Sequence, residues 1–122
     1  MSPRGFSPCP PSPNCVSTRA PASDDRHAIA PYRYQKSRVE AKEALKAAIA
    51  TLPRNNLIEE DQAYLRYEFT SLLFRFIDDV EFVFHDDEKM IHFRSASRIG
   101  YGDFGVNRRR MEEIRRLVDG KI

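Results

Sequence analysis

The sequence predicts an α+β domain built on a single antiparallel β-sheet of about four to five strands, flanked by one helix from the first half of the chain and by a C-terminal helix. Two helical stripes of apolar residues, at 37–52 and 107–118, bracket several segments in which apolar and polar residues alternate. Strands that follow one another without a helix between them favour antiparallel pairing over a parallel sheet.

Composition limits the classes of function. The 122 residues fit one domain with a modest core, and 20 Lys and Arg against 18 Asp and Glu leave a formal net charge of +2. So small a charge gives no bulk field of the kind that favours nucleic acid. There is no apolar run of membrane-spanning length and no apolar signal segment at the start, so we expect a cytoplasmic chain with no membrane span and no nucleic-acid partner.

Residues 1–26 form a Pro- and Ser-rich segment that we expect to be extended and irregular, and residues 27–120 form the α+β domain. The first segment contains Cys9 and Cys15. Three states are open for them: two free thiols, a local disulfide, which needs an oxidising compartment, or a metal site completed by histidines. The spacing matches no standard zinc pattern, so free thiols are the first expectation for a cytoplasmic chain. The prolines and Asn14 nevertheless indicate that this segment packs against the domain.

The clearest helix is predicted after Ser37, which forms a capping box with Glu40. Pro53 ends it. The residues of its apolar stripe are Ala41, Ala44, Leu45, Ala48, Ile49 and Leu52. Before this helix, residues 27–34 are typical of a short extended segment, which Pro31 confines to a sheet edge or to a tether.

Strands are predicted at 57–59, 63–71, 80–84 and 91–98, with 74–77 leading into the third. If residues 86–89 form the turn before the last strand, three pairs face each other across the hairpin: Phe84 with Ile91, Phe82 with Phe93, and Glu81 with Arg94. The expected core consists of Phe69, Phe82, Phe84, Phe93, Leu45, Ile49, Ile114 and Leu117.

The segment 93–110 has the most unusual composition, with arginines and serines in alternation, three glycines and an arginine triplet. Alternation places Arg94 and Arg98 on one face. The glycines indicate a shaped loop. Asn107 is the expected N-cap of the last helix, and Gly120 is its expected C-cap.

This strand register gathers charges on the sheet face that lies away from the aromatic core. They are Arg66, Glu68, Glu81, Arg94 and Arg98, near Asp78 and Asp79. One interpretation is cross-strand ion pairing, and the other is a pocket lined by guanidinium groups, which suit carboxylate or phosphate. Because the glycine loop is short, we expect Arg108–Arg110 to fold back toward Arg94 and Arg98, with Asp79 and Asp103 as the nearest neutralising groups.

Three motifs resemble one family: CPPSPNCVS at the start, FIDDVEF in the middle, and RSASRIGYGDFGVNRRR before the last helix. The resemblance covers about residues 9–117, and the family is that called domain of unknown function 1499. The resemblance implies a small domain of bacteria and plastid-bearing organisms, sometimes found behind a signal or lipoprotein segment. It therefore gives an alternative localisation, exported or plastid-targeted, if a presequence is missing. It implies no activity.

The motif positions and the charged face together select a hypothetical ligand-binding set. Its members are Arg94, Ser95, Ser97, Arg98, Tyr101, Asn107, Arg108, Arg110, Asp78, Asp79, Glu81 and Asp103. No catalytic residue is assigned, because Asp78 and Asp79 point to opposite faces and the two serines have no obvious His–Asp partner. No cofactor or metal is expected either.

The sequence therefore argues against an enzyme. We expect a binding domain for a small anionic ligand or an acidic group of a protein partner. The alternative is a structural or assembly module in which the network of Arg, Asp and Glu only stabilises the fold.

Overall fold

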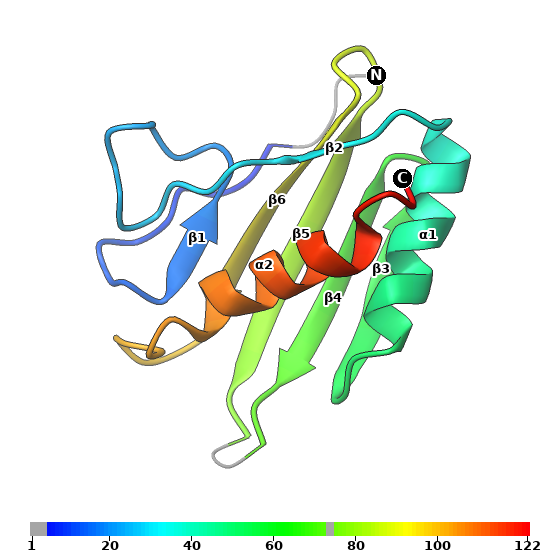
Figure 1. Ribbon diagram of the computed structural model, residues 1–122. Helices are drawn as coiled ribbons and strands as arrows, with labels where there is room; N and C mark the ends of the chain where they lie inside the picture. Colours follow the sequence, from blue (N-terminus) through cyan, green and yellow to red (C-terminus); the bar gives the residue numbers. More distant parts are fainter. Residues whose placement is uncertain (1–4, 73–74) are drawn as a thin grey trace.

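The computed structural model describes residues 5–72 and 75–122 and has the predicted class, with two helices against one face of an open antiparallel sheet (Figure 1). The elements in chain order are β1 (Cys15–Ser17), β2 (Tyr32–Arg33), α1 (Arg38–Ala50), β3 (Asn55–Asp61), β4 (Tyr64–Thr70), β5 (Ile77–His85), β6 (Met90–Ser97) and α2 (Val106–Val118). Neither helix in the described ranges is long and apolar enough to cross a membrane.

The sheet has the strand order β1-β6-β5-β4-β3, and β2 also pairs with β6. The described part of the chain thus has six strands, slightly more than expected, because two short strands from the first 33 residues join the edge of β6. β2 follows Pro31 directly, which agrees with an extended segment at a sheet edge. β3 is longer than the predicted 57–59 and carries an irregularity between Leu57 and Glu59.

The hairpin of β5 and β6 has the predicted register. Its pairs include Phe84 with Ile91, Phe82 with Phe93, and Glu81 with Arg94. The polar turn fixes this register, and Lys89 in the turn takes a left-handed φ of 56°. Of the segment 74–77 that was expected to lead into β5, Phe74 lies outside the described residues.

The core lies between the sheet and the two helices. Seven of the eight residues expected there are buried, whereas Leu117 is only partly buried and Val118 packs into the core beside it. α1 begins as predicted, since the Ser37 hydroxyl accepts a hydrogen bond from the backbone N–H of Glu40. It ends at Ala50, before Pro53.

The start of α2 differs from the prediction. Its N-cap is Gly105, at a left-handed φ of 77°, and the Asp103 carboxylate accepts hydrogen bonds from the backbone N–H groups of Gly105 and Asn107. Asn107 as N-cap is therefore wrong, because its side chain is buried beneath the helix. The C-cap is Asp119, and Gly120 follows it at a φ of 75°, the conformation typical of the residue after a helix.

Residues 5–33, here called the N-terminal arm, include β1 and β2 and pack against the domain, as was expected for the segment around Cys9 and Cys15. β1 pairs with β6, and the buried Asn14 donates a hydrogen bond to the carbonyl of Gly100. Cys9 and Cys15 form a disulfide, so the first expectation of free thiols is wrong. The pairing of β1 with β6 and the turn before it bring the two Cα atoms to 5.7 Å, within the usual range for a bridge.

Removing this disulfide should destabilise the protein. Closing so short a loop restricts the unfolded chain by about 2 kcal/mol in the chain-entropy model, so we expect Cys9→Ser to lower the melting temperature by several degrees. Thermal unfolding with and without dithiothreitol measures the effect. Dithiothreitol should lower the melting temperature of the wild type and leave that of Cys9→Ser unchanged. An equal response of both proteins would contradict a stabilising bridge.

Candidate functional site

The alternation of β6 divides the predicted site residues between the two faces of the sheet. Ser95 hydrogen-bonds to Asn107 of α2, whereas Arg98 hydrogen-bonds to Asp79 on the face that carries no helix, here called the outward face. The expected convergence of Arg94 and Arg98 with Arg108–Arg110 is therefore wrong. The glycine loop does return the chain toward the end of β6, but α2 packs on the opposite face from both arginines.

Arg98 on the outward face is neutralised by two carboxylates. Its guanidinium lies 2.7 Å from Asp79 and 2.9 Å from Glu68, and Arg66 lies within 3.8 Å of the same two groups. These hydrogen bonds, above all the one with Asp79, raise the pKa of Arg98 above its ordinary value. For Arg98 the geometry is that of cross-strand ion pairing, with Asp79 as the predicted partner.

The other two outward residues of the predicted set have different partners. Arg94 faces Glu81 in the register, but its closest polar contact is with the backbone carbonyl of Pro8, 3.4 Å away. Glu81 instead accepts a hydrogen bond of 2.8 Å from the Tyr64 hydroxyl. Arg94 thus contacts the N-terminal arm, and no described carboxylate forms an ion pair with it.

A buried cluster of polar side chains lies beneath the first turns of α2. Arg110 forms an ion pair of 2.6 Å with Asp78, and the two side chains are only 11% and 8% exposed. The same guanidinium donates to Ser95 and to Asn107, and it stacks over the Phe69 ring at 4.7 Å. Asp78 belongs to this cluster because it shares the helix-facing side of β5 with Val80 and Phe82.

Asn107 connects this buried cluster to the arm. Its amide nitrogen donates to the Asn14 carbonyl, the Ser97 hydroxyl and the Asp103 carboxylate. Burial on its own raises the pKa of Asp103. The hydrogen bonds from Asn107 and Gly105 together have a larger opposite effect, so the pKa lies below its ordinary value. An internal carboxylate therefore occupies the N-terminus of α2, where the helix dipole favours an anion.

Two arginines of α2 hold irregular backbone of the arm. Arg108 donates to the carbonyls of Asp25, Arg26 and Ala28 from a single nitrogen, at 2.9–3.5 Å. Arg115 similarly donates to the two carbonyls before β2. Guanidinium groups thus satisfy backbone acceptors that no sheet partner reaches.

A cavity of about 320 Å³, here called the arm pocket, lies between the arm and the glycine loop. It is lined by Pro13, Val16, Arg26, Gly102, Asp103, Phe104, Gly105 and Arg108. Phe104 is 95% exposed beside it. Arg26 donates to the carbonyl of Pro11, and neither Arg26 nor Arg108 forms an ion pair with a described carboxylate.

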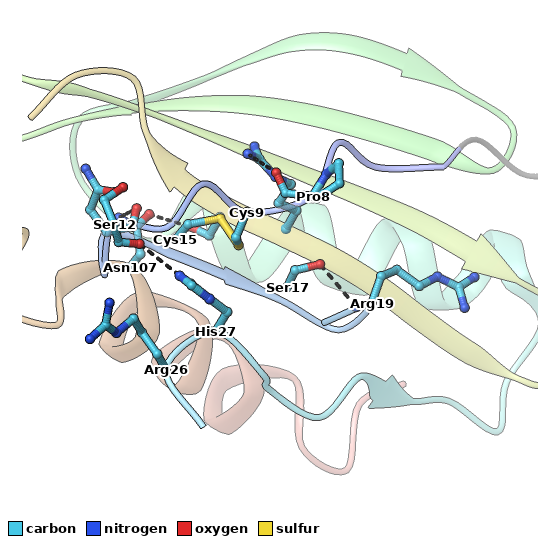
Figure 2. Close-up of a disulfide and its surroundings, with 12 residues drawn as sticks. Pro8, Cys9, Ser12, Cys15, Ser17, Arg19, Arg26, His27 and Asn107 are labelled. Atoms are coloured by element: carbon cyan, nitrogen blue, oxygen red, sulfur yellow. Dashed lines mark hydrogen bonds between the residues drawn. A yellow bond between two sulfur atoms is a disulfide. The ribbon is translucent and has the colours of Figure 1, made fainter. Parts of the chain in front are cut away.

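Figure 2 shows the arm around the disulfide, with the His27 ring directed toward the Ser12 carbonyl and the Arg26 side chain extending away from the disulfide. His27 also contacts Asp24 at 2.7 Å, so both of its ring nitrogens have partners within the arm. These contacts fix the backbone on either side of Arg26.

The family model of proteins of unknown function DUF1499 matches residues 5–118. The chain belongs to this family. No curated protein and no solved structure matches the chain.

The predicted site residues of this DUF1499 chain fall into three groups. Asp78, Ser95, Ser97, Asp103, Asn107 and Arg110 form the buried cluster, Asp79, Glu81, Arg94 and Arg98 lie on the outward face, and Arg108 lines the arm pocket, as the half-buried Asp103 also does. Tyr101 is exposed in the glycine loop. The two sides of the sheet could have been separated from the alternation, because Asp78 is in phase with the core residues of β5.

Arg26 is the charged pocket residue of this DUF1499 domain that the sequence did not predict. It lies outside the three motifs and meets Arg108 only through the path of the arm, so no local pattern identifies it. His85 and His92 are different. They flank the predicted turn, and in the predicted register their side chains lie on the same face of the hairpin. The contact between the two rings could therefore have been predicted from the sequence.

Proposed function

We propose that this DUF1499 domain is a non-catalytic binding module that takes a small anionic ligand, or an acidic group of a partner, in the arm pocket. The observation that carries the proposal is that Arg26 and Arg108 form no ion pair with a described carboxylate, since the Asp103 carboxylate in the same pocket accepts from Gly105 and Asn107. Arg98 and Arg110, in contrast, already have carboxylate partners. Guanidinium groups present several N–H donors in a fork that fits carboxylate and phosphate oxygens.

The donors that remain on the two arginines support this role. Arg108 uses one terminal nitrogen for the arm carbonyls, and Arg26 uses one for Pro11, so each retains N–H groups for another acceptor. The volume of about 320 Å³ suits a small group. Residues of the first and last motifs line the same cavity, so a single binding role would account for both motifs.

The second candidate is a structural or assembly module. It is favoured by the outward face and the buried cluster, where carboxylates inside the protein already neutralise Arg98 and Arg110. Under this alternative, Arg26 and Arg108 only fasten the arm, and no anion stabilises the protein.

The disulfide supports a proposal on the compartment as well. Disulfides persist in oxidising compartments and are rare in the cytosol. The bridge between Cys9 and Cys15 therefore favours the alternative of an exported or plastid-targeted protein over a cytoplasmic one.

Sulfate and phosphate should raise the melting temperature of the wild-type protein relative to chloride at matched ionic strength. An anion at ten times its dissociation constant adds about 1.4 kcal/mol to the free energy of unfolding, which corresponds to several degrees. Arg26→Gln should abolish most of this increase while changing the melting temperature in chloride only slightly, because Arg26 is exposed and makes a single hydrogen bond. Scanning calorimetry measures both quantities.

Arg98→Gln is the matched control, since it removes the same charge from the outward face. It should keep the response to sulfate. If Arg98→Gln loses the response and Arg26→Gln keeps it, the ligand site is on the outward face. If no anion acts differently from chloride, the structural alternative holds.

A further inference from the structure

A second constellation of side chains lies far from the arm pocket, at the hairpin between β5 and β6. It consists of His85 at the end of β5, Glu88 in the turn and His92 in β6. One possible ligand atom from each of the three lies within 4.8 Å of the others. Both histidines point to the outward face because each shares its phase with the outward residues of its strand.

We propose that His85, Glu88 and His92 bind a divalent transition-metal ion of the kind that prefers imidazole, with zinc as the representative. The ligand atoms are Nδ1 of His85, Oε1 of Glu88 and Nε2 of His92. A neutral imidazole nitrogen and a carboxylate oxygen are the donors that zinc takes besides thiolate. Three protein ligands leave a fourth position for water or another molecule. The proposal goes beyond the sequence, from which no metal was expected.

The distances fit such an ion. Tetrahedral bonds of about 2.0–2.1 Å place neighbouring ligand atoms roughly 3.3 Å apart. In the structure, Glu88 Oε1 lies 3.4 Å from His92 Nε2 and 3.7 Å from His85 Nδ1. The two histidine nitrogens lie within 4.8 Å of each other, so the two rings must rotate toward each other to complete the site, and both are held on adjacent paired strands.

The hydrogen bonds around Thr18 orient His92 for this role. The Thr18 hydroxyl oxygen lies 3.0 Å from Nδ1 of His92 and accepts from the backbone N–H of Phe93. Nε2 of His92 lies 3.4 Å from Glu88 Oε1, so without a metal the ring can donate from Nε2 to this carboxylate while the Thr18 hydroxyl donates to Nδ1. Metal binding at Nε2 needs the ring proton on Nδ1, and Thr18 can accept it there because its hydroxyl can donate instead to the carbonyl of Phe93, 3.3 Å away.

Arg19 opposes the metal at His85. Its guanidinium contacts Nε2 of His85 at 2.9 Å, so in the neutral ring the proton lies on Nδ1, the proposed ligand atom. Binding therefore moves the ring proton from Nδ1 to Nε2 and displaces the exposed Arg19 side chain into solvent. Arg19 also places a positive charge beside the ion. Its removal should strengthen binding, an effect opposite to that of losing a ligand.

Titration of the full, tag-free chain with zinc chloride, in competition with a chelating dye and without reductant, tests the proposal. The disulfide keeps Cys9 and Cys15 from competing for zinc. We expect saturable binding of one ion per chain. Glu88→Gln should weaken it by at least about 10-fold, because even groups that only support metal ligands contribute that much to affinity. Arg19→Gln should strengthen it, because it removes a positive charge beside the ion.

Asp87→Asn is the matched control for Glu88→Gln. It removes one carboxylate from the same exposed turn without removing a ligand, and it should change the affinity by less than about 3-fold, as expected for screened surface charge. Both residues are exposed, so neither variant should fail to fold. Long-range proton–nitrogen spectra should show zinc on Nε2 of His92 and Nδ1 of His85, with His27 unchanged.

Three results would overturn the proposal. The first is the absence of saturable zinc binding, which would leave a His92–Glu88 ion pair as the sole purpose of the constellation. The second is an equal loss of zinc affinity in Asp87→Asn and Glu88→Gln, which would mean that Glu88 acts only through its surface charge and not as a ligand. The third is a change in the His27 ring signals in place of those of His85 and His92.

Discussion

Asp78→Ala is expected to lower the free energy of unfolding by about 3–5 kcal/mol, because it leaves the buried guanidinium of Arg110 without its carboxylate. The ion pair is 2.6 Å long and almost inaccessible to solvent. Ser95 and Asn107 accept the other hydrogen bonds of Arg110 but carry no charge to replace that of Asp78. Urea denaturation followed by circular dichroism measures the loss.

The neighbouring carboxylate provides the control. Asp79 lies on the outward face, where its ion pairs with Arg98 and Arg66 are partly exposed, so Asp79→Ala should cost about 1 kcal/mol or less. Replacing both partners of the buried pair, as in Asp78→Leu with Arg110→Met, should recover much of the stability lost in Asp78→Ala. Equal losses of unfolding free energy in Asp78→Ala and Asp79→Ala would mean that the buried ion pair stabilises the fold no more than the exposed ones.

Phe82→Ala is expected to cost a similar amount, about 3–5 kcal/mol, because it opens a cavity at the centre of the core. The Phe82 ring is fully buried, and its centroid lies 6.2–6.4 Å from the rings of Tyr32, Tyr67 and Phe93. These three residues come from β2, β4 and β6, so the loss would weaken the whole sheet. The same urea denaturation measures it.

An exposed apolar residue gives the comparison for Phe82. Ile58 of β3 is 43% exposed, and Ile58→Ala should cost less than about 1 kcal/mol. If Phe82→Ala costs as little as Ile58→Ala, the face of β5 that meets the helices has been assigned to the wrong side.

The sequence was sufficient for the hairpin of β5 and β6 because both determinants are local. Alternation assigns each side chain to a face, and the polar turn at 86–89 sets the pairing of Phe82 with Phe93. The capping box of α1 is local in the same way. Such features need no knowledge of the rest of the chain.

The surroundings of the arginines depend on contacts between distant segments, and this is why their convergence was predicted wrongly. Alternation separates Arg94 and Arg98 from Ser95 and from the aromatic core, but it does not say whether the arginines at the start of α2 turn toward the core or toward the outward face. Helix packing decides that, and it buries Arg110 against Asp78. The arm pocket likewise needs Arg26 and Arg108 to meet across 82 positions of sequence. A periodic pattern in the sequence cannot predict a contact between such distant segments.

The two short strands of the arm also keep the sheet from pairing edge to edge with other copies of the protein. β1 and β2 cover the outer edge of β6, a strand whose alternating pattern and unpaired backbone groups would otherwise be a template for another chain. The opposite edge, β3, needs no such cover, since it ends in Glu59, Glu60 and Asp61 and is irregular after Leu57. A protease that cuts the arm before β2, or a reductant that loosens it, would therefore expose a growing point for edge-to-edge aggregation.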